Sequence, residues 1–123
     1  PTPIHIARLA DDGMALHGSV STLITNDRAW EGAVTEGPFM VEHGGMFYLF
    51  YSGNSYANAT YAIGVARGTT PTAMMTKPAA PIVVTNSAWV GPGHCSVITT
   101  AHDETAERTP RRGGNGGPRA PRA

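Results

Sequence analysis

Two short segments place a chemically active side chain among glycine and proline residues. The first is a Glu-Gly-Pro segment at residues 36–38, and the second is a Gly-Pro-Gly-His segment at residues 91–94. Glycine lets backbone or substrate approach Glu36 closely, and a histidine on a rigid turn can ligate a metal ion or a water molecule. From spacing alone, Glu36 is either a catalytic carboxylate or a solvated acid in a turn. His94 is either a ligand or a histidine that is hydrogen-bonded within its turn.

Three further kinds of residue complete the set of candidates. Trp30 lies six residues before Glu36, and an aromatic ring near a carboxylate is typical of a sugar-binding cleft. Cys95 follows His94, but adjacent side chains on a strand point to opposite faces, so we expect a buried thiol rather than a Cys/His pair. The remaining histidines share no metal-ligand spacing and are predicted to be surface or turn residues: His5, His17, His43 and His102.

Short apolar runs with strand character must position these residues. They cover residues 4–9, 38–43, 46–52, 61–67, 81–84 and 95–99. Gly44 and Gly45 join two of these runs, which predicts a β-hairpin, and Asp11-Asp12-Gly13 predicts a turn between two strands. No run of ten residues repeats at helical spacing, so the sequence predicts an all-β fold.

Glu36 and His94 are 58 residues apart, which is about the length of four strands with their turns, or one propeller blade. If this spacing is a repeat length, the apolar run at 46–52 should recur at residues 104–110, and no apolar run occurs there. We therefore expect a folded body at residues 1–103 and a disordered tail at 104–123, because the tail has no aromatic residue and no aliphatic residue larger than alanine to bury. A linker and a truncated or frame-shifted reading are both open explanations of the tail.

Composition excludes several classes of protein. The chain has 123 residues, 15 glycines, 10 prolines, one cysteine and 15% charged residues. These numbers fit one domain and argue against a helical bundle or a disulfide framework. No apolar run approaches the roughly 18 residues of a membrane-spanning helix. Residues 1–103 carry a net charge of −3 and the arginine-rich tail +3, but the tail has no interleaved aromatic residues, so we predict no nucleic-acid binding.

Several segments in series resemble glycoside hydrolase family 43 across roughly residues 1–101. They are Trp30-Glu31-Gly32, residues 36–39, 45–53 and 61–67, and the segment 89–94. The resemblance implies a five-bladed β-propeller, of which this chain supplies about two blades. It also implies inverting hydrolysis of arabinose- or xylose-containing plant polysaccharides and oligosaccharides.

The resemblance also implies roles for single residues. Glu36 falls on the family's general acid, and His94 falls on a histidine near the propeller axis that helps to hold a calcium ion or water. Trp30, Phe39 and Trp89 are predicted to contact the substrate.

An inverting glycosidase needs a second carboxylate, about 6.5–9.5 Å from the acid, to activate water. The family's base motif and its aspartate that raises the acid's pKa belong before Pro1, and neither motif is present. We therefore expect a fragment that begins within a larger protein, carries the acid without the base and is inactive alone. Two alternatives stay open: a non-catalytic carbohydrate-binding or structural propeller piece, and an unrelated small β-domain whose basic tail binds nucleic acid.

Overall fold

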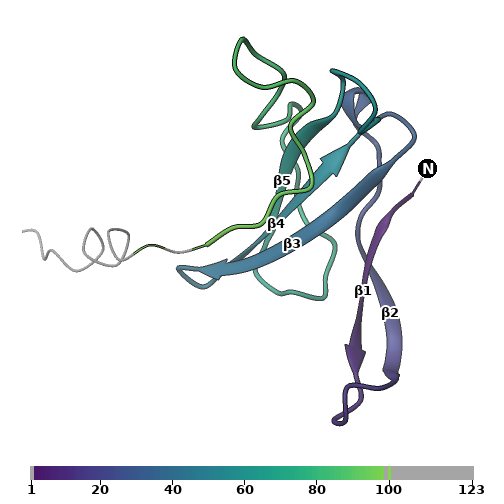
Figure 1. Cartoon of the computed structure of the whole chain (residues 1–123). Coiled ribbons are helices and arrows are strands. Elements are labelled where there is room, and N and C mark those ends of the chain that lie inside the picture. The colour runs from purple at the N-terminus through teal and green to yellow at the C-terminus, as the bar shows by residue number, and fades with distance from the viewer. Residues whose placement is uncertain (1, 99, 101–123) are drawn as a thin grey trace, which may run out of the picture.

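The computed structural model describes residues 2–98 and 100, which form two antiparallel sheets and one short 3-10 helix, η1 (Figure 1). A two-stranded sheet pairs β1 with β2, and a three-stranded sheet has the order β3-β4-β5. In chain order the elements are β1 (Ile4–Leu9), β2 (Leu16–Ile24), η1 (Ala29–Glu31), β3 (Thr35–His43), β4 (Met46–Gly53) and β5 (Ala62–Gly68).

The strands predicted at 4–9, 38–43, 46–52 and 61–67 are confirmed as β1, β3, β4 and β5. The hairpin is confirmed too, since Gly44 and Gly45 connect β3 to β4 with φ angles of +58° and +74°. Such positive angles suit glycine because it has no Cβ to clash. The turn at Asp11-Asp12-Gly13 likewise connects β1 to β2.

Three sequence predictions differ from the structure. Strand β2 has no predicted counterpart, because its first five residues are exposed and only Leu23 and Ile24 are buried. The run at 81–84 forms only a bridge between Val83 and Ile63 at the edge of β5. The run predicted at 95–99 does not form a strand over the described residues 95–98. The strand that contains Glu36 therefore has no counterpart after His94 within those residues. The predicted tail at 104–123 lies outside the described residues.

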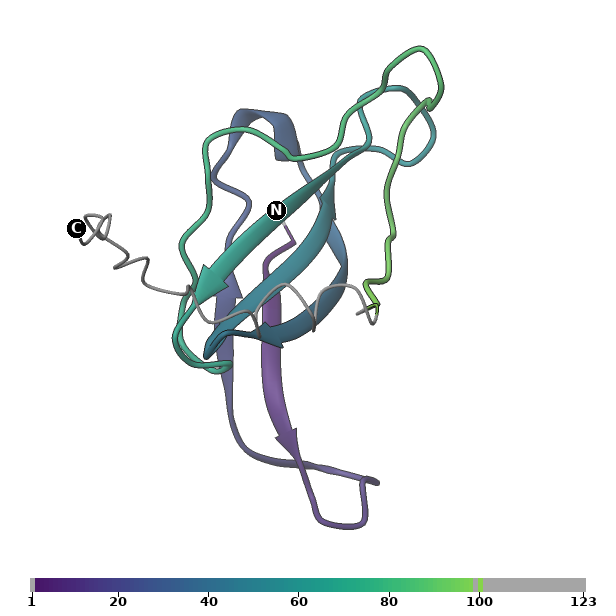
Figure 2. The ribbon, with the colours of Figure 1, turned by 90° about the vertical axis from the view of Figure 1, so that its left-hand side faces the viewer.

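The core lies between the base of the β1–β2 hairpin and one face of the three-stranded sheet. Leu49 of β4 is in register with Met40 of β3 and with Ala66 of β5, so all three side chains lie on the core face. The buried core residues are Ile4, Leu23, Ile24, Leu49, Tyr51, Ala66 and Met75. The tip of the hairpin extends beyond the sheet (Figure 2).

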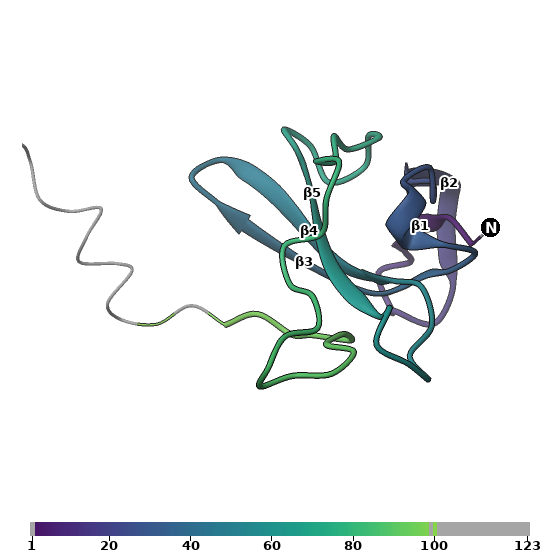
Figure 3. The ribbon, with the colours of Figure 1, turned by 90° about the horizontal axis from the view of Figure 1, so that it is seen from above.

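Two further features matter for the site. The hydroxyl of Thr2 accepts a hydrogen bond from the Thr35 N–H at 2.8 Å, which ties the start of the chain to the start of β3. Seen from above, the β1–β2 hairpin lies on one side of the three-stranded sheet and the segment leading through residues 85–98 on the other (Figure 3).

None of the described residues belongs to a helix long and apolar enough to cross a membrane.

Candidate active site at the start of strand β3

Glu36 is the second residue of β3, where it pairs with Ser52 of β4. The register shifts between Glu36 and Phe39, and Gly37 within this irregular stretch has a φ of +56°. The side chain is half-buried, and its Oε1 accepts a hydrogen bond from the Tyr61 hydroxyl at 2.7 Å. Glu36 is therefore a strand carboxylate with a fixed donor rather than a freely solvated acid in a turn.

His94 lies directly against the backbone next to Glu36, although 58 residues separate the two in sequence. A Cβ added at Gly37 would lie 3.1 Å from the Nδ1 of His94, so a larger residue there would crowd the imidazole ring. The His94 backbone N–H donates to the Ser52 Oγ at 2.7 Å. The structure thus brings the two predicted site residues, Glu36 and His94, together at the same end of the sheet.

Tyr61, which precedes β5, links these two parts of the site and was not predicted as a site residue. It is 4% exposed, and a Cβ at Gly93 would fall 1.8 Å from its Cε1. The glycine before His94 is therefore required by the tyrosine ring. Burial, and then the hydrogen bond to Glu36, raise the pKa of the Tyr61 phenol, while the Ser52 hydroxyl opposes the shift. The phenol consequently remains a hydrogen-bond donor over the neutral pH range.

The three predicted aromatic contacts lie in different surroundings. Trp30 packs on Tyr51 with ring centroids 5.7 Å apart, and its ring occupies the space beside Gly53 and Gly64. It therefore lies on the core face, opposite the face of Ser52. Phe39 is 36% exposed on β3, and Trp89 is 66% exposed in the loop before His94. Their substrate contacts stay predictions.

A pocket of about 250 Å³ opens beside Glu36. It is smaller than the roughly 300–1,000 Å³ of pockets that take drug-sized ligands, so it has room for a small chemical group. Asn54 is held there with a φ of +73°, since its side chain donates to the Trp30 carbonyl and accepts from the Ser55 N–H. The lining residues are Ala33, Val34, Glu36, Asn54, Ser55 and Tyr56.

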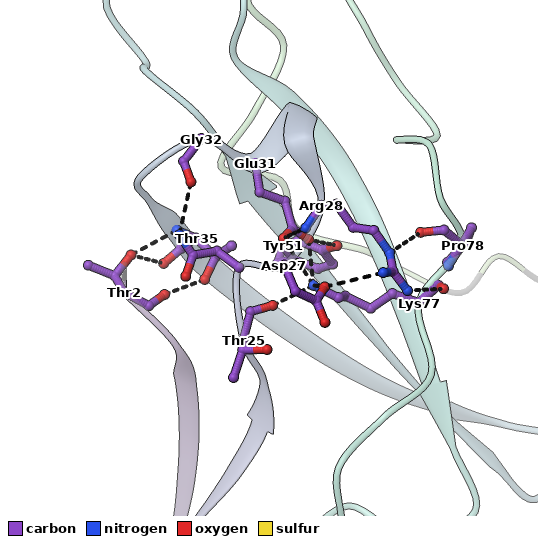
Figure 4. Close-up of polar contacts among 11 residues, drawn as sticks. Thr2, Thr25, Asp27, Arg28, Glu31, Gly32, Thr35, Tyr51, Lys77 and Pro78 are labelled. Atoms are coloured by element: carbon purple, nitrogen blue, oxygen red, sulfur yellow. Dashed lines mark hydrogen bonds and ion pairs between the residues drawn. The ribbon is translucent and has the colours of Figure 1, made fainter.

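A buried ion pair supports the turn that leads into β3 (Figure 4). Glu31 is fully buried, and its carboxylate accepts from Lys77 Nζ at 2.7 and 3.0 Å and from the Tyr51 hydroxyl at 2.7 Å. The Arg28 N–H donates to it at 3.0 Å, and Lys77 Nζ also contacts Asp27 at 2.8 Å. We call this set the Glu31–Lys77 network.

The Glu31–Lys77 network joins η1, β4 and the segment that follows β5. Lys77 is 46 residues from Glu31, and no local pattern in the sequence indicates their contact. The ion pair supports the start of β3, because only three residues separate Glu31 from Thr35 and the Asn54 N–H donates to the carbonyls of both Glu31 and Val34. Sequence reasoning placed Glu31 in a motif but did not identify its partners.

Within residues 2–98 and 100, no group of three or more His, Cys, Asp or Glu side chains is arranged to hold a metal ion. A calcium ion near His94 stays a prediction. The thiol of Cys95 is free and half-buried.

A family model and a solved structure indicate the same family for this chain. The model of glycosyl hydrolases family 43 matches residues 1–107. No curated protein matches the chain significantly. Among solved structures, a thermostable family-43 glycoside hydrolase has a TM-score of 0.73 and 34% identity, with 80% of this chain and 34% of that chain covered.

Two further solved structures are similar. An endo-1,4-beta-xylanase from Bacteroides thetaiotaomicron has a TM-score of 0.71 and 32% identity, over 76% of this chain and 35% of that chain. An alpha-L-arabinofuranosidase from Lactobacillus brevis has a TM-score of 0.69 and 25% identity, over 81% and 33%. The chain thus spans about a third of the length of each structure. The chain belongs to glycosyl hydrolase family 43, and its sheets are parts of the family's five-bladed β-propeller.

Proposed function

We propose that this chain is part of an inverting glycoside hydrolase that acts on arabinose- or xylose-containing plant polysaccharides and oligosaccharides, with Glu36 as its general acid. The observation that carries the proposal is the Glu36 carboxyl group, which is held by Tyr61 and lines a small pocket. The similar structures support the substrate class, since one is named a xylanase and another an arabinofuranosidase.

In the proposed reaction, the protonated Glu36 gives its proton to the glycosidic oxygen as the bond to the anomeric carbon breaks. A water molecule attacks from the opposite face, and a second carboxylate takes its proton. The other described carboxylates lie elsewhere: Asp27 and Glu31 contact Lys77, Glu42 is exposed towards the far end of β3, and Asp11 and Asp12 lie in the exposed β1–β2 turn. The base is therefore assigned to another blade. Calcium at His94 is part of the proposal, but no step depends on it.

A chimera tests the role of Glu36. Residues 2–100 replace the matching segment of the thermostable family-43 hydrolase, which completes the propeller. Glu36→Gln should lower kcat on arabino- or xylo-oligosaccharides by about 10²–10⁴-fold, because general acid catalysis contributes about that much. Nitrophenyl glycosides should lose far less, because their leaving group needs little protonation.

The matched control is Glu42→Gln, which removes an exposed carboxylate from the same strand. It should leave both activities unchanged. Equal losses on both substrates after Glu36→Gln would contradict the assignment. A folded chimera that binds the oligosaccharides without hydrolysing them would instead support a non-catalytic carbohydrate-binding piece.

A further inference from the structure

We propose that Tyr61 is the positioning residue of the general acid: its hydroxyl holds Glu36 Oε1, so that Oε2 is the oxygen that carries and delivers the proton. The proposal rests on the proposed function, because it needs Glu36 to be the acid. It adds a residue 25 positions away in sequence and assigns distinct tasks to the two carboxyl oxygens.

The Tyr61 ring has little freedom to move away from Glu36. The side chain is buried, with 4% exposure, and the 91–93 segment passes over it so closely that a Cβ at Gly93 would overlap the ring. A Cβ at Gly91 would lie 2.6 Å from the Asn58 carbonyl oxygen, and that carbonyl accepts the Tyr61 N–H at 3.3 Å. Both ends of the residue are thus held, and the hydroxyl stays 2.7 Å from Oε1.

This hydrogen bond occupies one oxygen throughout the reaction. The Tyr61 hydroxyl donates its proton to Oε1, and the Ser52 hydroxyl, which opposes the rise in the Tyr61 pKa, occupies the phenol oxygen as a donor. With Oε1 already accepting and the phenol oxygen already taken, the acidic proton of Glu36 is assigned to Oε2. The raised pKa of Tyr61 keeps the phenol in its donor form. The arrangement removes the ambiguity between two equivalent carboxyl oxygens and therefore reduces the number of unproductive states.

The same bond becomes stronger as the reaction proceeds. The proton leaves Oε2 for the glycosidic oxygen, the electron pair of the C–O bond goes to that oxygen, and Glu36 becomes a carboxylate. The Tyr61 hydrogen bond is then charge-assisted, and such bonds are about twice as strong as neutral ones. An interaction that strengthens in the transition state raises kcat without tightening substrate binding.

Tyr61→Phe in the chimera tests the inference, because it keeps the ring against Gly93 and removes only the hydroxyl. We expect kcat on oligosaccharides to fall about tenfold with little change in KM, since one charge-assisted hydrogen bond is lost from the transition state. Nitrophenyl glycosides should be nearly unaffected. Tyr48→Phe, on β4 and away from Glu36, is the matched control and should change neither activity.

A double variant separates positioning from packing. In Glu36→Gln/Tyr61→Phe the second substitution should add no further loss, because Tyr61 acts through Glu36. Equal loss on both substrate types, an additive loss in the double variant, or no loss at all would overturn the role of Tyr61. If Glu36→Gln itself shows no dependence on the leaving group, the proposed function fails, and the inference fails with it.

Discussion

Replacing Lys77 with methionine would leave the buried Glu31 carboxylate without its cation. The Lys77 side chain is 4% exposed and that of Glu31 is 0% exposed. The substitution removes two hydrogen bonds to Glu31, at 2.7 and 3.0 Å, the contact with Asp27 and the hydrogen bond to the Thr25 carbonyl. Glu31 keeps only the Tyr51 hydroxyl and the Arg28 N–H as donors.

Removing one partner of a buried ion pair costs about 3–5 kcal/mol. We expect Lys77→Met to lower the free energy of unfolding of the chimera by that amount, measured by urea denaturation at neutral pH. Glu31→Gln/Lys77→Met should recover a large part of the loss, because no uncompensated charge remains buried. The methionine stem preserves most of the packing around Tyr51 and so isolates the charge.

Asp11→Asn is the control, since Asp11 pairs with Arg8 in a salt bridge whose side chains are 74% and 100% exposed. Exposed pairs contribute only about 0–1 kcal/mol. The reasoning is refuted if Lys77→Met costs no more than Asp11→Asn, or if the double variant is less stable than Lys77→Met alone.

Gly93→Ala should destabilise the chimera and lower its activity, because the new methyl group overlaps the Tyr61 ring; an unchanged melting temperature would contradict this. Burial raises the pKa of Tyr51 and of Tyr61, so the unfolded chain loses these phenol protons first and stability should fall as pH rises above about 10, with a shallower fall in Tyr51→Phe. His94→Ala should weaken activity and any calcium dependence together, and unchanged activity with or without a chelator would argue for a turn histidine. The 123-residue chain alone should neither hydrolyse aryl arabinosides or xylosides nor melt cooperatively, since exposed apolar side chains such as Leu16, Val20 and Val90 lack a neighbouring blade. The apolar run Met46–Tyr51, by contrast, is covered as part of the central strand β4. A sharp transition in a soluble monomer would refute the folding half of this prediction.

Local pattern was enough to predict most of the strands and the two site segments. Alternating apolar residues indicate that one face of a strand will be buried, which is why β3, β4 and β5 were predicted with nearly correct bounds. Two glycines between apolar runs indicate a hairpin, because the tight turn needs positive φ angles at those two residues alone. The Glu36 and His94 segments were recognisable because glycine and proline restrict the backbone over a few residues.

Where local pattern was weak, pairing with a distant segment decided the structure. Strand β2 is largely exposed and forms because β1 lies beside it. Within the described residues, the apolar run at 81–84 contacts β5 on one side and has no strand on its other side. It therefore contributes only one bridge, between Val83 and Ile63. An apolar run therefore predicts that a segment can become a strand, while the available partners determine whether it does.

By itself, the sequence determined the all-β class, the family and the positions of Glu36 and His94, because each depends on residues close together in the chain. Only the tertiary structure decided what these residues touch. The Tyr61 hydroxyl reaches Glu36 across 25 residues, Lys77 reaches Glu31 across 46, and His94 reaches Ser52 across 42. A hydrogen bond or a buried ion pair depends on which donor is brought within about 3 Å after packing, and one sequence carries no local signal of that distance.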